Sequence, residues 1–360
     1  MGYVSKYVRE NIFAPHPEHE EKRFLDLLVS VIKRYDRCVV IPADDATLVT
    51  VSRHKTELEK QAIIQCTSWD VTQKFLDKKY TYALAEQHGI PAPKTIVPQS
   101  AEEVRRSANT IQLPCLVKPC YSHHYFEKFK KKMAEVHTVE QMVAEYQRAT
   151  DAGVEVMIQE LITGDDTLGI NYNSYFVDGE PLIEFTAEKV RLSPPSYGIP
   201  CVVRSREAIP EVLEYGRKIL RALNFEGYSC TEFKWDARDG KYKLMEVNGR
   251  HNRSGLLSVR CGINFPWIAY MHDTALKPPD VDSYSTGIYW IDEFKDISTT
   301  TKRVVMGRYS PVRFIIPYFR PHIYAVFDWH DLRPFLKRVV NGLTLIFSST
   351  IKILFHNKGT

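Results

Sequence analysis

The sequence lacks any uninterrupted apolar run of about 18 residues, the length that a membrane-spanning helix requires. Its first residues, MGYVSKYVRENIF, contain no apolar core before a small-residue cleavage site, so we expect no signal peptide. Internal repeats and low-complexity linkers are also absent. These features predict a cytoplasmic globular protein, and its 360 residues are enough for about two or three domains.

The sequence has few cysteines, and their pattern excludes a small disulfide-stapled fold. There are seven, an odd number, scattered along the chain and several of them inside apolar runs. Reduced, partly buried thiols have this distribution in cytoplasmic proteins. Aromatic residues make up 12% of the chain, which excludes an intrinsically disordered protein.

Positive charge is concentrated at the C-terminal end. Residues 301–360 contain ten Lys or Arg and two Asp, a net +8, so the first 300 residues carry −4 of the total +4. Such a segment could contact nucleic acid, an anionic membrane or an acidic face of the same protein. The remaining chain has no nucleic-acid-binding signature, so we expect no nucleic acid partner. For the apolar stretch 343–355, packing on the body or on a second subunit is favoured over peripheral membrane contact.

Hydrophobic periodicity predicts alternating helices and strands, an α/β (α+β) architecture. Asp178-Gly179 and Asp239-Gly240 each predict the turn of a β-hairpin, and Pro278-Pro279 is the best boundary signal. The expected helices are 19–35, 70–88, 101–107, 138–152 and 210–223, and the expected strands are 38–42, 113–119, 154–161 and the hairpins 169–177/181–189 and 228–236/241–247.

The second hairpin carries the most informative polar pattern. Side chains alternate across a strand, so Glu232 and Lys234 share one face of the first arm, and Glu246, Asn248 and Arg250 share one face of the second. Two carboxylates and an amide oxygen are ligands suited to Mg²⁺, and an adjacent arginine can bind a phosphoryl oxygen. A solvated hairpin face is the alternative interpretation.

With these residues, the chain resembles the ATP-grasp superfamily over about residues 74–275. The resemblance rests on motifs in the family's order: Asp77-Lys78 before a helix ending at Gly89, Lys118 on an apolar strand, Lys132 before a helix, the segment Gln159-Glu160-Leu161-Ile162, and the set Glu232, Glu246, Asn248 and Arg250. It implies an ATP-grasp fold of two lobes gripping ATP. Lys78, Lys118 and Lys132 would contact the nucleotide, 159–162 would form the adenine-binding hinge, and Glu232, Glu246 and Asn248 would bind Mg²⁺ or Mn²⁺. Arg250 would be catalytic.

The resemblance is closest to predicted ATP-grasp carboxylate–amine ligases, whose ATP-binding fold is like that of carbamoyl-phosphate synthase. The shared features are Asp44-Asp45, Lys189-x-Arg191 followed by Pro194-Pro195 and Gly198, and the segment 248–254. It implies a reduced or truncated N-terminal α/β domain at 1–73, an ATP-grasp domain at 74–277 with a mobile lobe at about 115–160, and a basic C-terminal extension at 278–360. The phosphate flap 120–131 departs from many relatives because it contains no glycine.

The implied activity is an ATP-dependent ligation of a small-molecule carboxylate to an amine through an acyl phosphate, releasing ADP and phosphate. Asp165 or Asp166 would bind the ribose, with Asp166 preferred. Lys189 and Arg191 would bind the triphosphate or the substrate carboxylate, although a solvated strand end explains them equally well. A bicarbonate-activating carboxylase and a non-catalytic nucleotide-binding regulator are the alternatives, and a homodimer is the default assembly.

Overall fold

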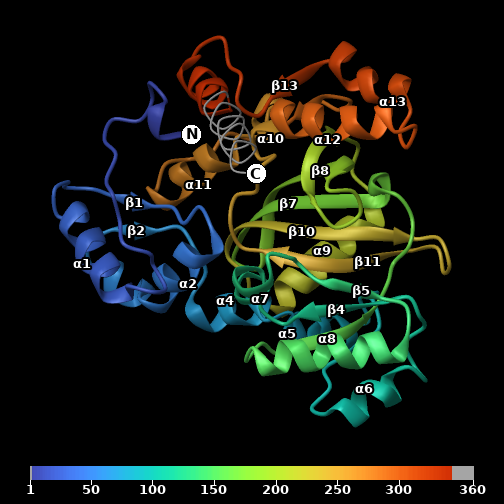
Figure 1. The fold of residues 1–360 in the computed structure, drawn as a ribbon. Helices are drawn as coiled ribbons and strands as arrows, with labels where there is room; N and C mark the ends of the chain where they lie inside the picture. Colours follow the sequence, from blue (N-terminus) through green and yellow to red (C-terminus); the bar gives the residue numbers. More distant parts are fainter. Residues whose placement is uncertain (1, 343–360) are drawn as a thin grey trace, which may run out of the picture.

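The computed structural model describes residues 2–342, with the side chains of 122–124 and 127 left aside. It contains helices and three β-sheets, which confirms the α/β (α+β) fold class. Figure 1 shows an N-terminal unit at one side, a small sheet below, a large central sheet and the C-terminal helices above it. Within the described residues, no helix combines the length and apolar character needed to cross a bilayer. The stretch 343–355 lies outside the described residues.

The N-terminal unit is a two-stranded parallel sheet covered by helices. It consists of η1 (Gly2–Val4), α1 (Glu21–Ile32), β1 (Val39–Val40), α2 (Asp45–Arg53), α3 (Lys55–Leu58) and β2 (Ile63–Ile64). Its core is built on Ile32, Val51, Leu58 and Ile64. The side chain of Asp44 accepts a hydrogen bond from the Thr47 amide and thereby caps α2.

The single helix expected at 70–88 is wrong, because the chain forms two helices there. They are α4 (Trp69–Leu76) and α5 (Lys78–Gln87). Asp77 has extended backbone angles, and its carboxylate accepts a hydrogen bond from the Lys79 amide at 3.2 Å. A capping aspartate stabilises a new helix start, so Lys78 becomes the first residue of α5.

A four-stranded antiparallel sheet forms the lower lobe in Figure 1. Its order is β3-β6-β4-β5, with β3 at Thr95–Ile96, β4 at Cys115–Pro119, β5 at Ala134–Val136 and β6 at Val156–Glu160. Two helices, α6 (Ala101–Ser107) and α8 (Val139–Asp151), contribute to its apolar core. The glycine-free flap contains a helix, α7 (Ser122–Phe129), directly after β4.

The central sheet has seven strands in the order β11-β10-β7-β8-β9-β12-β13. These are β7 (Gly169–Val177), β8 (Glu180–Ser193), β9 (Ile199–Ser205), β10 (Gly227–Asp236), β11 (Lys241–Asn248), β12 (Tyr289–Ile291) and β13 (His322–Tyr324). Both expected hairpins are present, with Asp178-Gly179 and Gly240 at positive φ. The extension continues this sheet through β12 and β13, so it is part of the same layer.

The remaining helices cover or flank the central sheet. They are η2 (Asp166–Leu168), α9 (Pro210–Ala222), α10 (Leu256–Arg260), α11 (Phe265–Asp273), α12 (Glu293–Val305), α13 (Pro311–Ile315) and η3 (Ile316–Phe319). Residues of α9 join the core that includes Phe75, and residues of α10 and α11 join the core that includes Trp290. In Figure 1, α11 lies between the N-terminal unit and the central sheet.

Candidate active site

The β10–β11 hairpin places the expected metal ligands on one face. Glu232 lies directly opposite Glu246 in the register, and Cys230 lies directly opposite Asn248. Side chains two residues apart on a strand share a face, so Asn248 stands beside the carboxylate pair. Its amide nitrogen donates to the Cys230 carbonyl at 3.5 Å. The hairpin register therefore brings two carboxylates and an amide together.

Lysines from three other elements surround this carboxylate pair. The Nζ of Lys78 lies 2.8 Å from Oε1 of Glu246, and Lys189 on β8 forms an ion pair with Glu232. Burial alone would raise the pKa of Glu246, but the charges of Lys78, Lys118 and Lys132 outweigh it and lower that pKa to about 2. Glu246 is therefore ionised at neutral pH, as metal coordination requires.

Lys118 and Lys132 approach from the small lobe. Lys118, on β4, donates to the Tyr82 hydroxyl at 3.0 Å and to the side-chain oxygen of Gln159 at 3.2 Å. The Nζ of Lys132 lies 3.4 Å from the carbonyl oxygen of Gly198, and burial lowers the pKa of this lysine. Both lysines interact electrostatically with Glu246, as do Lys78 and Lys189. Four of the expected site lysines therefore cluster around the hairpin face.

The expected hinge segment leaves β6 and passes beside β10. The Glu160 carboxylate accepts from the Lys94 amide and pairs with Arg238, while the Gln159 side chain is fully buried. At the end of the segment, Lys234 donates to the carbonyl oxygens of Ile162 and Gly164 at 2.9 and 3.2 Å. The sequence placed Lys234 on the metal-site face but gave it no role. Leu161 lies within the same connection and makes no side-chain hydrogen bond.

Two residues expected to contact ligand have structural partners instead. The Arg191 guanidinium is 1% exposed and donates to both oxygens of Asp296 at 2.7 and 2.6 Å. The Asp166 carboxylate accepts from the amides of Leu192 and Ser196 at 2.9 and 3.0 Å, which orders the β8–β9 connection. These contacts give Arg191 and Asp166 structural roles, and their assignment as ligand-binding residues stays a prediction.

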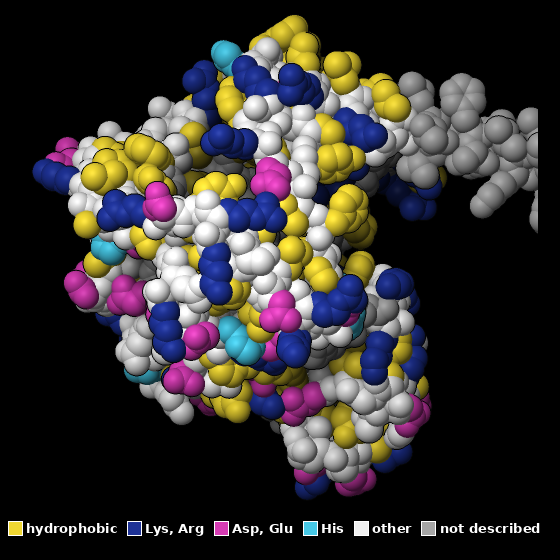
Figure 2. Space-filling view, turned by 90° about the vertical axis from the view of Figure 1, so that its left-hand side faces the viewer, with side chains coloured by type: hydrophobic (Ala, Val, Ile, Leu, Met, Phe, Trp, Pro, Cys, Tyr) yellow, Lys and Arg dark blue, Asp and Glu magenta, His cyan; other side chains and the backbone are white. Residues whose placement is uncertain are grey.

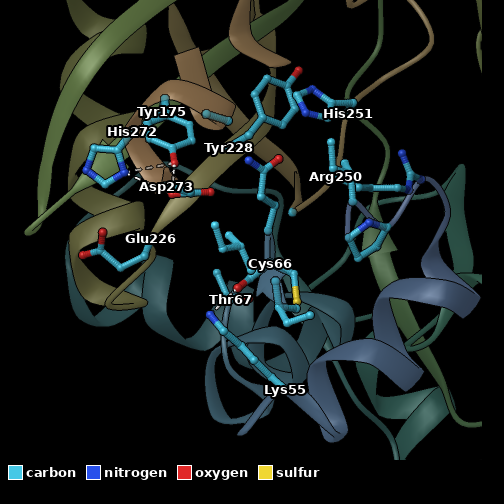
Figure 3. A pocket seen from close by; sticks show the side chains of 18 of the residues that line it. Lys55, Cys66, Thr67, Tyr175, Glu226, Tyr228, Arg250, His251, His272 and Asp273 are labelled. Atoms are coloured by element: carbon cyan, nitrogen blue, oxygen red, sulfur yellow. Dashed lines mark hydrogen bonds and ion pairs between the residues drawn. The ribbon is translucent and has the colours of Figure 1, made fainter. Parts of the chain in front are cut away.

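Arg250 connects the hairpin to a cavity of about 430 Å³ between the N-terminal unit and the central sheet. In Figure 3, Arg250 and His251 lie on one side of this cavity, with Glu226, His272 and Asp273 on the other and Lys55 below. Arg250 forms an ion pair with Asp45, the first residue of α2. One wall of the cavity therefore carries the Arg250 guanidinium, paired with Asp45, and the opposite wall carries the carboxylates of Glu226 and Asp273.

The cavity contains polar groups that lack protein partners. Both side-chain amide atoms of Gln65 are buried and make no hydrogen bond with the residues that the structure describes. The His251 ring stacks on Tyr228 with centroids 4.2 Å apart, and burial lowers the pKa of His251 to about 4. Buried polar atoms normally have a partner, so the Gln65 amide is an exception in the wall of this cavity. Gln65 and Tyr228 were missed from the sequence because no local pattern marks them.

Three oxygen-bearing side chains on the hairpin face, Glu232, Glu246 and Asn248, are the expected ligands of a divalent cation. Among the described residues, no group of three His, Cys, Asp or Glu could hold a metal ion. The expected set depends on an amide as its third ligand, and two carboxylates with one amide oxygen suit Mg²⁺. Glu232 and Glu246 are partly exposed, at 23% and 34% of the side chain, so a cation can reach them. The residues fit the metal.

Comparisons with known proteins give the fold a family context. No family model matches the chain. D-aspartate ligase of Enterococcus faecium is 25% identical over 263 residues, and the match covers 67% of this chain and 61% of that protein. D-alanine–D-alanine ligase of Ectopseudomonas mendocina is 24% identical over 226 residues, covering 57% of this chain and 67% of that protein.

Two solved structures have the same fold. Biotin carboxylase of Campylobacter jejuni superposes with a TM-score of 0.61 at 14% identity, covering 75% of this chain and 62% of that one. L-amino acid ligase of Bacillus licheniformis superposes with a TM-score of 0.56 at 17% identity, covering 75% and 63%. The chain thus spans about three fifths of the length of several proteins that it matches.

Proposed function

The chain has the ATP-grasp fold, and on that premise we propose that it is an ATP-dependent ligase that joins a small-molecule carboxylate to an amine. One observation carries the proposal: Glu232 and Glu246 face each other, each beside a lysine, and Arg250, which interacts electrostatically with Glu246, lines a cavity. Anionic phosphates need cations, and a hard metal needs carboxylates, so this arrangement suits a metal–nucleotide complex.

The proposed division of roles follows the positions of the side chains. Lys78, Lys118, Lys132 and Lys189 bind phosphate oxygens, and the backbone of 159–162 contacts the base. Glu232, Glu246 and Asn248 hold Mg²⁺ or Mn²⁺, which when bound neutralises charge on the β- and γ-phosphates. Transfer of the γ-phosphoryl group to a carboxylate oxygen gives an acyl phosphate and ADP. The amine then attacks the acyl carbon, loses a proton and displaces phosphate.

The cavity is the proposed place for the carboxylate and amine substrates. Arg250 lies on the wall nearest the carboxylate pair, where it can stabilise negative charge that develops on the acyl group. Gln65 also lines this cavity, and its buried amide lacks a partner among the described residues. A cytoplasmic location is part of this proposal, and the seven unpaired cysteines support it. A homodimer remains a prediction.

The test is release of ADP and phosphate from Mg-ATP in the presence of pooled amino acids and small carboxylates. We expect turnover that requires one carboxylate and one amine, and its loss in Glu246→Ala. Glu180→Ala is the matched control, because Glu180 also pairs with a basic residue, Arg221, but lies at the start of β8 away from the hairpin. Turnover that needs bicarbonate alone would favour the carboxylase alternative. ATP binding without turnover in any pool would favour the regulator.

A further inference from the structure

The C-terminal extension has an outer surface at residues 302–320 on which large apolar side chains are exposed; we call it the 302–320 face. It runs from the end of α12 through α13 to η3. Val305 and Phe319 are 82% and 83% exposed. Several exposed apolar side chains within one short segment commonly mark an interaction site. Its exposed apolar residues are Val305, Met306, Val312, Ile315, Ile316 and Phe319.

The same face carries only positive charge in its sequence. No acidic residue occurs between Asp296 and Asp328, and Asp296 is fully buried. Asp165, from the connection before β7, interacts electrostatically with Arg313. In Figure 1, α13 lies at the upper right, so it faces away from the viewer in Figure 2, whose visible upper part shows hydrophobic and basic side chains of neighbouring parts of the surface. The cations of the face are Lys302, Arg303, Arg308, Arg313 and Arg320.

A buried polar network holds this face in place from below. Arg191 donates to the carbonyl oxygens of Arg313 and Phe314 at 3.0 and 3.3 Å while it pairs with Asp296. The Tyr318 hydroxyl donates to the same Asp296 carboxylate at 2.8 Å. The backbone of α13 is therefore anchored to α12 and β8, and the outward exposure of its apolar side chains is a property of an ordered surface.

We propose that the 302–320 face docks on an anionic membrane surface. Apolar side chains that project among cations match the lipid interface. The acyl region accepts the apolar side chains, and the acidic headgroups attract the cations. A second copy of the chain is the weaker occupant, because a two-fold contact would place this uniformly basic face against itself. Nucleic acid would neutralise the cations but would leave Val305, Val312 and Phe319 in water.

Vesicle co-sedimentation of the full chain tests the proposal without depending on the ligase activity. The vesicles are phosphatidylcholine alone or phosphatidylcholine with 30% phosphatidylglycerol. We expect binding to the anionic vesicles only, weakened by high salt. Phe319→Ser should reduce the partition coefficient about tenfold. The triple variant Arg308→Gln/Arg313→Gln/Arg320→Gln should reduce it about 100-fold, at about fivefold per cation.

Matched controls separate this face from the general surface. Leu182→Ser removes an exposed apolar side chain from the start of β8, and Arg105→Gln/Arg106→Gln/Lys218→Gln removes three cations from α6 and α9. Both should bind vesicles like the wild type. Equal binding by the wild type and both face variants would overturn the proposal, as would an absence of anionic-vesicle binding by the wild type. Self-association that Phe319→Ser abolishes, without vesicle binding, would also overturn it and assign the face to a second copy.

Discussion

Arg250 and Asp45, which are 205 residues apart in sequence, form a two-point ion pair. The Nε of Arg250 donates to one carboxylate oxygen at 2.6 Å and a terminal nitrogen donates to the other at 3.1 Å. The planar guanidinium is thereby fixed in orientation. Because Asp45 begins α2 and Arg250 follows β11, this contact also fixes the N-terminal unit relative to the proposed metal ligands.

Asp45→Asn should therefore impair catalysis more than folding. The amide keeps the shape but loses one acceptor and the charge, so Arg250 can leave its orientation. We expect kcat to fall about 10- to 100-fold, as displacement of a positioned group does, and stability to fall by about 1 kcal/mol, since the pair is partly exposed. ATP affinity should change little. Glu21→Gln, which alters an ion pair elsewhere in the N-terminal unit, is the control. Equal losses in both variants would contradict the positioning role.

Asn248→Ala should weaken metal binding while leaving the fold intact. The Asn248 amide makes one long contact, 3.5 Å to the Cys230 carbonyl, so the hairpin depends little on it. We expect the Mg²⁺ concentration for half-maximal ADP release to rise at least tenfold, because groups around metal ions have effects of about 10- to 100-fold. Chelation by EDTA should abolish release in both proteins. An unchanged Mg²⁺ requirement, with Asn109→Ala as the comparison, would remove Asn248 from the ligand set.

The hairpin face was only partly predictable from local signals. Asp239-Gly240 sets the turn and the register as far as the pair Phe233–Leu244, which by itself would place Glu232 opposite Met245. A β-bulge between Glu232 and Phe233 shifts the register by one residue and brings Glu246 opposite Glu232. The lysines were predicted only through the family resemblance, since a lone lysine on a strand carries no such information. The break at Asp77 was also available locally, because an aspartate before Lys78 is a helix-capping signal.

The remaining features depend on contacts between distant segments. Arg191 was assigned to ligand binding through the family resemblance and its place at a strand end, and its partner Asp296 is 105 residues away in the sequence. The cavity could not be predicted, since Gln65, Tyr228 and Arg250 come from three separate parts of the chain. The sequence identified Asp44-Asp45 as a motif shared with the predicted carboxylate–amine ligases, but it did not show that the two residues have different roles. Asp44 caps a helix and Asp45 orients Arg250.

His251 should make stability depend on pH. Its pKa is about 4 in the folded protein, because burial disfavours the charged ring, against 6.5 for the unfolded value. The unfolded state therefore binds more protons between these values, and the free energy of unfolding falls as pH drops from about 6.5 to 4. Relative to pH 7, we expect a loss of about 2 kcal/mol at pH 4.5.

Urea titration of the wild type and of His251→Gln measures this contribution. The variant lacks the titrating ring but can occupy the same space beside Tyr228. The unfolding free energy of the wild type minus that of the variant should fall by about 2 kcal/mol from pH 7 to 4.5, because only the wild type loses the contribution of His251. A difference that is constant over this range would show that His251 titrates alike in both states.

Arg191→Met should destabilise the protein without acting on the nucleotide site. The Arg191 side chain is 1% exposed and the Asp296 side chain is fully buried. The substitution therefore leaves an uncompensated carboxylate in the interior. Loss of one partner of a buried pair costs about 3–5 kcal/mol, and Arg191→Met/Asp296→Leu should recover part of it. Arg204→Met is the matched control, since its pair with Glu188 is 41% exposed on the arginine side and should cost about 1 kcal/mol or less. The readouts are urea unfolding and equilibrium ATP binding. A stable Arg191→Met protein with ATP affinity reduced tenfold would instead place this arginine at the nucleotide.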